Sequence, residues 1–220
     1  MNPIDFYFDF ISPYAYIAST HIVEMAHAHG RTLTWKPFRL GVAVVKVMGL
    51  PPVMQTPLKS DYVWHDVRRL ARILKLPFSG VDFDPQPLPP ARAMLGAPAG
   101  LAGAFARAML HAQWAEGRNL GDTDVILDVA ERVGIAASAI RKALEDPATR
   151  EAVNTATREA IERGVFGSPT CVVGGELFWG VDRLWLLDHY LKSGEKYAPM
   201  VPTPDAGLHC IGAYLQKVAL

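Results

Sequence analysis

Apolar residues first gather near the N-terminus, in the run IDFYFDF over 4–10. Phe6, Phe8 and Phe10 alternate with other residues, while Ile4 and Tyr7 add apolar character on both parities. A strand with one face in water alternates strictly, whereas a strand covered on both faces is apolar almost throughout. The pattern therefore predicts a central β-strand.

A helix is expected directly after this strand. Ser12 suits the N-cap position and Pro13 the first helical position, where a missing N–H costs nothing. Ala-rich sequence with apolar residues every three or four positions extends to about His29, and Gly30 suits the left-handed stop. Alternation resumes in TLTWKPF (32–38), which predicts a second strand and an opening β-α-β unit.

The middle of the chain has a different periodicity. After a Gly- and Pro-rich connection over 41–57, apolar residues recur at helical spacing. The predicted helices cover 62–76, 91–116, 122–133, 136–144 and 150–163, and Gly164 ends the last of them. This stretch predicts a block of helices without strands.

Strand-like sequence returns in PTCVVGGELFWG (169–180), where Gly174 and Gly175 form a predicted two-residue hairpin turn. The next segment, VDRLWLLDHYL (181–191), predicts a final helix with Asp182 as its N-cap. Beyond it, a Pro-rich passage precedes residues that predict a short helix with one apolar face, which would pack on the core or on a second subunit: Leu208, Ile211, Leu215 and Val218.

This order of elements resembles the thioredoxin arrangement. The predicted fold class is α/β, thioredoxin-like, with a large all-helical insertion between the β-α-β and β-β-α halves. Residues 1–40 and 150–195 would form a discontinuous thioredoxin-like domain, 41–149 the helical insertion and 196–220 a C-terminal tail.

Composition narrows the partners. Of 220 residues, 22 are lysine or arginine and 22 are aspartate or glutamate, so the formal net charge is zero. The overall charge therefore attracts neither nucleic acid nor an anionic membrane. Asp5 and Asp9 interrupt the only candidate export signal, and no run of about 18 uncharged apolar residues occurs. Two cysteines, Cys171 and Cys210, fit a reducing compartment, although their pairing stays open. We expect a cytoplasmic protein with no nucleic-acid or membrane partner.

The strand-to-helix turn carries the first candidate chemistry. Thiol redox proteins often place Cys-x-x-Cys at such a turn, and here the four positions are Ser12-Pro13-Tyr14-Ala15. The N-terminus of a helix stabilises a nearby anion by about 0.3–2 kcal/mol. Serine has no redox chemistry but can donate a hydrogen bond to the sulfur of a ligand. Alternatively, Ser12 only caps its helix.

Two further turns offer polar groups. Pro169 enters the third strand after Ser168, and a cis proline there would expose the main chain of Ser168 to a peptide-like ligand. Val181 and Asp182 open the final helix, where main-chain N–H groups suit a carboxylate and Asp182 suits an ammonium group. Ordinary strand entry and ordinary capping are the alternatives.

Three stretches together resemble the 2-hydroxychromene-2-carboxylate isomerases, relatives of kappa-class glutathione transferases within the DsbA-like thioredoxin superfamily: FYFDFISPYAYIA, TPLKSDYVWHDVRRLA and GVFGSPTCVVGGELFWGVDRLWLL. The resemblance covers about residues 4–192.

The resemblance implies glutathione as cofactor, with Ser12 contacting its sulfur. It also implies that Ser168, before a cis Pro169, pairs with the cysteinyl backbone, that Val181 and Asp182 hold the γ-glutamyl end, and that Lys59 crosses over the site. One departure is Gly49-Leu50, where many members carry Gly-Asn and use the asparagine to bind glutathione.

The resemblance further implies an isomerase of a conjugated aromatic pyruvate, in which bound glutathione thiolate adds to a C=C bond and leaves again. We expect a homodimer acting on a small aromatic substrate. A kappa-like glutathione transferase and a non-catalytic thiol- or peptide-binding protein remain alternatives. A disulfide oxidase is nearly excluded, because Ser12 and Ala15 leave no attacking or resolving thiol.

Other conspicuous residues receive no catalytic role. Lys59 suits a glutathione or substrate carboxylate as well as a plain surface position. His27 and His29 lack partners at ligand spacing, so no metal site is predicted. Cys171 is expected to be a buried small hydrophobe. One helical face is expected to be solvated, and it carries His65, Asp66, Arg68, Arg69 and Arg72. Three aromatic residues either wall a pocket or fill the core: Phe38, Phe178 and Trp179.

Overall fold

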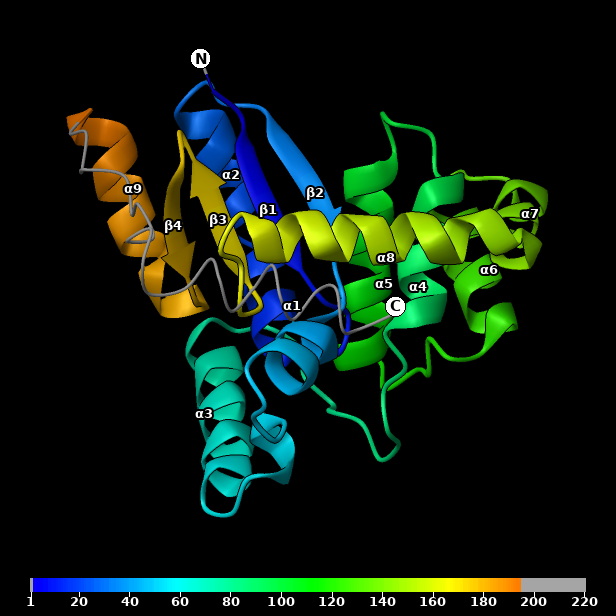
Figure 1. Cartoon of the computed structure of the whole chain (residues 1–220), viewed down its shortest axis with the longest axis horizontal. Helices are drawn as coiled ribbons and strands as arrows, with labels where there is room; N and C mark the ends of the chain where they lie inside the picture. Colours follow the sequence, from blue (N-terminus) through cyan, green and yellow to red (C-terminus); the bar gives the residue numbers. More distant parts are fainter. Residues whose placement is uncertain (1, 195–220) are drawn as a thin grey trace.

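A computed structural model describes residues 2–194 (Figure 1). Its single sheet has the strand order β2-β1-β3-β4. β1 (Ile4–Phe8) runs parallel to β2 (Leu33–Pro37) and antiparallel to β3 (Thr170–Val173). β3 and β4 (Glu176–Trp179) form an antiparallel hairpin around Gly174 and Gly175. Strands more than 150 residues apart in sequence therefore lie side by side.

The prediction of a central first strand is confirmed. β1 lies between two partners, and every residue in it except the half-buried Asp5 is buried. Phe6 and Phe8 join the larger apolar core with residues of helices α1 (Pro13–Ser19) and α5 (Ala102–Trp114). Tyr7 faces a smaller cluster that includes Ile161 of helix α8 (Pro147–Glu162). Apolar residues on both parities are needed because helices cover both faces of the sheet (Figure 1).

The helix expected over 13–29 is two helices, α1 (Pro13–Ser19) and α2 (Ile22–Ala28). Hydroxyl groups at the junction explain the break. Ser19 Oγ donates to the carbonyl of Tyr16 and Thr20 Oγ1 to that of Ile17, each at 2.7 Å, so side chains compete for the carbonyls that end the helix. Alanine-rich periodicity did not reveal this interruption.

The middle of the chain is helical, as predicted, with different boundaries. The expected helix over 91–116 is wrong as a single element, because Pro98 and Gly100 separate two helices there. Part of the 41–57 connection is itself helical. The elements are η1 (Val42–Val47), η2 (Val53–Gln55), α3 (Lys59–Ile73), α4 (Leu88–Ala93), η3 (Met94–Gly96), α5 (Ala102–Trp114), α6 (Thr123–Arg132), α7 (Ala137–Glu145) and α8 (Pro147–Glu162).

Two of these helices join the helical block to the sheet. α5 packs on α1 and β2, and α8 contacts α4 at one end and β2 along its course (Figure 1). Gly103 of α5 lies so close to Trp35 of β2 that a Cβ atom there would collide with the indole ring. The domain boundaries at 40 and 149 stay a prediction, since α8 belongs to both regions by its contacts.

The chain then follows the predicted order through β3, β4, a short 3-10 turn η4 (Val181–Arg183) and α9 (Leu184–Ser193). The predicted tail helix lies outside the described residues. Within 2–194, none of the helices combines the length and apolar character required to cross a membrane.

Candidate thiol-binding site

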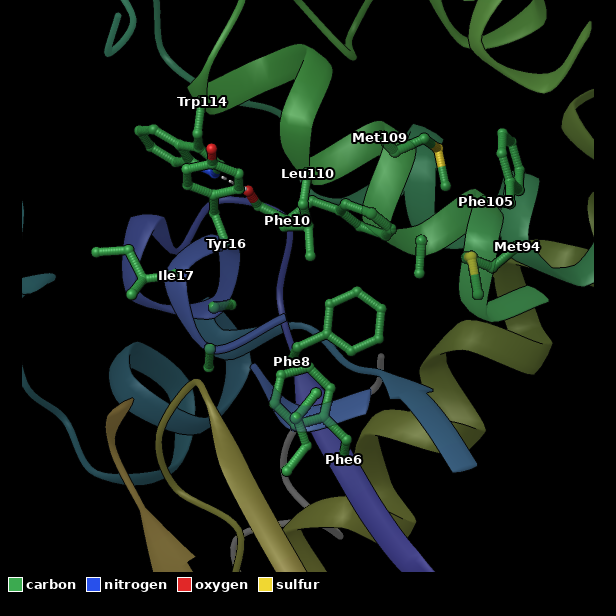
Figure 2. Packing of buried hydrophobic residues seen from close by; sticks show 14 of the residues in the cluster. Phe6, Phe8, Phe10, Tyr16, Ile17, Met94, Phe105, Met109, Leu110 and Trp114 are labelled. Carbon is green, nitrogen blue, oxygen red and sulfur yellow. Dashed lines mark hydrogen bonds between the residues drawn. The ribbon is translucent and has the colours of Figure 1, made fainter. Parts of the chain in front are cut away.

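The β1–α1 turn is held from the helical block. Gln113 Nε2 and Trp114 Nε1 of α5 both donate to the carbonyl oxygen of Phe10, at 2.6 and 2.9 Å. Phe10, Gln113 and Trp114 are all at most 2% exposed, and Figure 2 shows the indole above the turn with its bond to Phe10. Two donors on one buried carbonyl fix the backbone two residues before Ser12.

Ser12 occupies the predicted N-cap position. Its Oγ accepts a hydrogen bond from the N–H of Ala15 at 3.2 Å, and Pro13 follows at the first helical position. The same Oγ donates to the carbonyl oxygen of Ser168 at 3.0 Å. Ser12 is only 5% exposed. Ser12 therefore does cap its helix, as the alternative expected. In addition, its hydroxyl proton points to another loop, 156 residues away in sequence.

The Ser168 loop faces this turn with its main chain. The Ser168–Pro169 peptide bond is cis, and Pro169 is buried while Ser168 is half-buried. Ser168 Oγ accepts from the N–H of Asp9 at 2.9 Å. The loop is packed from behind, since the indole of Trp179 fills the space that a Cβ atom of Gly167 would occupy.

Asp9 is the buried acid between these two loops. Its Oδ2 accepts from Leu40 N at 2.7 Å and its Oδ1 from Ile11 N at 3.2 Å. Asp9 is 1% exposed, and burial raises its pKa to about 6 despite these hydrogen bonds and the positive charge of Arg39. Sequence reasoning treated Asp9 only as an interruption of an apolar run.

The third predicted turn lies beside the second. Gly180, with φ at +106°, donates its N–H to the carbonyl oxygen of Pro169 at 2.9 Å and so joins η4 to the proline loop. η4 also packs on α1. Val181 is half-buried and Asp182 is exposed. The structure therefore brings Ser12, Ser168 and Pro169 into one hydrogen-bonded unit, with Val181 and Asp182 at its edge.

One prediction at this turn is wrong. Asp182 does not cap α9, because Val181–Arg183 form a separate 3-10 turn and Arg183 occupies the N-cap position without a side-chain hydrogen bond. Instead Asp182 Oδ2 pairs with Arg183 Nη1 at 3.3 Å, and both side chains are about half or more exposed. A glycine turn before an acidic residue is typical of the start of a capped helix. Here the extra turn η4 lies between Gly180 and α9.

Lys59 begins α3 and is exposed, and its ammonium group pairs with no carboxylate among the residues from 2 to 194. No hydrogen bond joins it to Ser12 or Ser168 in that range. α3 is attached to α1 through Tyr14, whose hydroxyl donates to Asp66 Oδ2 at 2.8 Å. Asp66 Oδ1 also pairs with Arg69 at 2.6 Å. The expectation that Asp66 is merely solvated is therefore wrong, because its side chain is 15% exposed and joins two elements of the site.

Phe38, Phe178 and Cys171 belong to the core, whereas Trp179 does not. Phe38 and Phe178 are 1% and 4% exposed, which favours core packing over a substrate pocket, whereas Trp179 is 53% exposed and contacts Phe166 edge to face. Cys171 is 2% exposed, and burial raises its pKa to about 12, so it is an inert thiol at neutral pH.

No group of three metal-ligating side chains lies together in the described part of the chain. His29, at the end of α2, contacts Asp188 of α9 at 2.8 Å. Leu50, the departure from the pattern that the resemblance implies, is 52% exposed and offers no side-chain hydrogen bond.

Two cavities lie away from the serines. One, of about 320 Å³, lies between α1 and α5 beside Tyr16, Arg107 and His111. The other, of about 400 Å³, follows the face of α3 with Trp64, Arg68 and Arg72. Neither of these two cavities is lined by Ser12 or Ser168.

The arrangement offers hydrogen-bond donors and acceptors but no redox-active sulfur. A hydroxyl at the start of a helix can stabilise a thiolate that arrives with a ligand, and the main chain of Ser168 can pair with an extended peptide. Sequence reasoning found these two residues and Pro169. It missed Asp9 and Tyr14, for which the only signal was a polar residue directly after a buried strand and an aromatic residue in the first turn.

The chain is similar to known proteins over most of its length. The family model of the DSBA-like thioredoxin domain matches residues 3–192. A 2-hydroxychromene-2-carboxylate isomerase of Pseudomonas putida is 30% identical over 187 residues, which are 84% of this chain and 92% of that protein. The kappa 1 glutathione S-transferase of Homo sapiens is 27% identical over 223 residues, covering 93% and 97% of the two chains.

The fold comparison agrees. A solved structure of 2-hydroxychromene-2-carboxylate isomerase superposes with a TM-score of 0.77 at 29% identity, over 86% of this chain and 94% of that one. The predicted thioredoxin-like fold with a helical insertion is confirmed. The chain belongs to the 2-hydroxychromene-2-carboxylate isomerase family, within the proteins built on a DsbA-like thioredoxin domain.

Proposed function

We propose that the protein is a glutathione-dependent isomerase of a conjugated aromatic pyruvate, of the 2-hydroxychromene-2-carboxylate type. The observation that carries the proposal is the bond of 3.0 Å from Ser12 Oγ to the carbonyl of Ser168. It places a hydroxyl donor, in the position of a redox cysteine, against a main-chain edge suited to a peptide.

The residues present fit glutathione by their chemistry. Ser12 would donate to the sulfur, and Ser168 before Pro169 would pair with the cysteinyl backbone. The ammonium group of Lys59, which pairs with no carboxylate within residues 2–194, suits the glycyl carboxylate. N–H groups at Val181 and the carboxylate of Asp182 suit the γ-glutamyl end. Leu50 cannot replace the amide that many relatives use, so we expect this contact to be absent.

When bound, glutathione supplies a thiolate that adds reversibly to a conjugated C=C bond and thereby permits rotation about it. The protein supplies the environment for that sulfur. The hydroxyl proton of Ser12, now directed at the carbonyl of Ser168, would turn to the sulfur and favour its anionic form. Serine suits this role because it donates without becoming oxidised. Cys171, buried and protonated, cannot take the place of the ligand thiol.

A kappa-like glutathione transferase is the second candidate, favoured by the 27% identity to the enzyme of Homo sapiens. Both functions would use the same bound thiolate. They differ in stoichiometry, because an isomerase regenerates glutathione and a transferase consumes it. A binding protein without turnover would bind peptides and leave small electrophiles unchanged.

The test is an assay of extensively dialysed protein with 2-hydroxychromene-2-carboxylate, with and without glutathione, in which free thiol is titrated at the end. We expect turnover only with glutathione and no loss of thiol. S-methylglutathione is the matched control, since it offers the same peptide contacts without a nucleophilic sulfur and should support no turnover. Full activity of the dialysed protein without added glutathione would contradict the proposal, and loss of one thiol per product would favour the transferase.

Three further statements belong with this proposal. We expect the protein to work in the cytoplasm, to form a homodimer and to divide into domains at 40 and 149. Light scattering of the full chain tests the dimer.

A further inference from the structure

Asp9 has no part in the proposed chemistry, yet it forms hydrogen bonds with the turn that carries Ser12, with Ser168 and with Leu40. Its main-chain N–H donates to Ser168 Oγ at 2.9 Å, and its main-chain oxygen accepts from the N–H of Ser12 at 3.0 Å. One residue thus contacts both serines directly.

The carboxylate of Asp9 extends these ties to a third segment. Oδ1 accepts from Ile11 N, in the turn that leads to Ser12, and Oδ2 accepts from Leu40 N at 2.7 Å. Leu40 lies two residues before η1, in the connection that leads to Lys59 and α3. One carboxylate oxygen therefore holds the turn that carries Ser12, and the other joins this turn to the segment after β2.

The surroundings of Asp9 hold few charges. Arg39, in the segment after β2, lowers the pKa of Asp9 through its positive charge. Its guanidinium group donates to Asn154 of α8 and forms no ion pair with Asp9 in the described part of the chain. α8 presents Asn154 and Thr157 to that segment, both uncharged, and the proline loop presents the hydroxyl of Ser168. A carboxylate that is 1% exposed without an ion pair is costly, and its compensation is main-chain hydrogen bonds together with the nearby positive charge of Arg39.

We infer that Asp9 is a positioning residue: its main chain bonds both serines, its ionised carboxylate ties their turn to Leu40, and together these bonds hold Ser12 and Ser168 in register for glutathione and make the affinity for glutathione depend on pH. The inference rests on the proposed function for the identity of the ligand. It assigns to Asp9 no contact with glutathione.

The physical basis is that a carboxylate only accepts hydrogen bonds, whereas a carboxylic acid carries a proton that must itself be donated. Protonation of Asp9 places an O–H group against N–H donors and weakens the bond to Leu40 or to Ile11. Burial raises the pKa of Asp9 to about 6, so this change falls between about pH 5 and 7.

The first experiment measures the dissociation constant of S-methylglutathione by calorimetry from pH 5 to pH 8. This probe has no thiol proton, so a pH dependence reports groups of the protein. We expect the affinity of the wild type to fall up to about tenfold per pH unit below the pKa of Asp9. The Asp9→Asn variant should bind about threefold to tenfold more weakly at pH 8, because one acceptor is lost, and its affinity should not vary with pH in this range.

Asp122→Asn is the matched control, since Asp122 also accepts a main-chain N–H, from Asp124 at 2.9 Å, but at the start of α6. It should keep the affinity and the pH dependence of the wild type. An Asp9→Asn variant that keeps the pH dependence, or a wild type without one, would overturn the inference.

A second measurement needs neither ligand nor variant. Amide hydrogen exchange of the wild type, corrected for the intrinsic effect of pH, should show lower protection of Ile11 and Leu40 at pH 5 than at pH 7. Unchanged protection would overturn the inference. If no S-methylglutathione binds at any pH while this protection does change, the proposed function fails and the role of Asp9 in holding the serines stands.

Discussion

The two ends of the candidate site are built differently. At the inner end, Ser12, Ser168 and Asp9 are buried or half-buried and joined by hydrogen bonds of 2.9–3.0 Å. At the proposed outer end, Lys59 and Asp182 are exposed. Within residues 2–194, Lys59 forms no ion pair and Asp182 pairs only with its neighbour Arg183. The inner end is preorganised, whereas the outer end is free to adjust.

This difference follows the demands on each end. Stabilising a thiolate requires a donor held close to its final position, since misplacement lowers the rate steeply. Holding flexible charged groups at the ends of a tripeptide tolerates mobile, solvated side chains, each worth little energy. We therefore expect substitutions at the inner end to change catalysis or folding, and substitutions at the outer end to change affinity slightly.

The largest effect should come from Trp114, which supports the inner end through Phe10. Trp114→Ala removes a large side chain that is 2% exposed and its bond to the Phe10 carbonyl, so we expect a loss of about 3–5 kcal/mol in the free energy of unfolding. Urea denaturation measures it. Trp185→Ala is the control, because Trp185 is 65% exposed and should change stability by less than about 0.5 kcal/mol. Equal losses in both variants would mean that Trp114 of α5 does not support the β1–α1 turn.

Ser12→Ala should lower kcat by about 10²-fold, the usual effect of removing one donor to a developing or stabilised anion. Steady-state kinetics at saturating glutathione measure it. Ser19→Ala is the matched control on the same helix, because Ser19 is equally buried and its hydroxyl bonds to the carbonyl of Tyr16. A Ser12→Ala enzyme with wild-type kcat would remove the catalytic role of the inner end.

Asp9 should also alter the pH dependence of stability. Its pKa in the folded state, about 6, lies above the ordinary value of 3.8, because burial disfavours the charge. Stability from this group is therefore complete below about pH 4 and is lost as the pH rises through 6. We expect the free energy of unfolding of the wild type, relative to Asp9→Asn, to increase by about 1–3 kcal/mol from pH 7 to pH 4. A constant difference between the two proteins would show that the pKa of Asp9 is not raised.

At the outer end, Lys59→Ala should weaken glutathione binding only about twofold to fivefold, as expected for an exposed ion pair, and the difference should shrink at high salt. Calorimetry measures it. Lys142→Ala, which removes an exposed lysine of α7, should leave the affinity unchanged. A loss of a hundredfold for Lys59→Ala would mean that the outer end is as preorganised as the inner one.

The smallest effect should be that of Cys171→Ala on catalysis. Burial keeps this thiol protonated, with a pKa of about 12, so the variant should retain both its kcat and its dependence on glutathione. Kinetics with dialysed protein test this. Loss of the activity without loss of the fold would give Cys171 a chemical role.

Local signals in the sequence predicted many elements of the fold. Apolar residues on both parities predicted β1, and Ser12-Pro13 predicted the start of α1. The same kind of reasoning failed where side chains override periodicity. Hydroxyl bonds from Ser19 and Thr20 end α1 early, and the extra turn η4 moves the start of α9 past Asp182.

By itself, the sequence determined the order of strands and helices and the absence of a cysteine at Ser12, because spacing and capping act between near neighbours in the chain. Only the tertiary structure decided that Ser12 meets Ser168 and that Asp9 ties both to Leu40. These residues are up to 159 positions apart, and their contacts exist because β1 lies between β2 and β3 in the sheet. The raised pKa of Asp9 has the same origin, since burial depends on what packs around a residue and not on its neighbours in sequence.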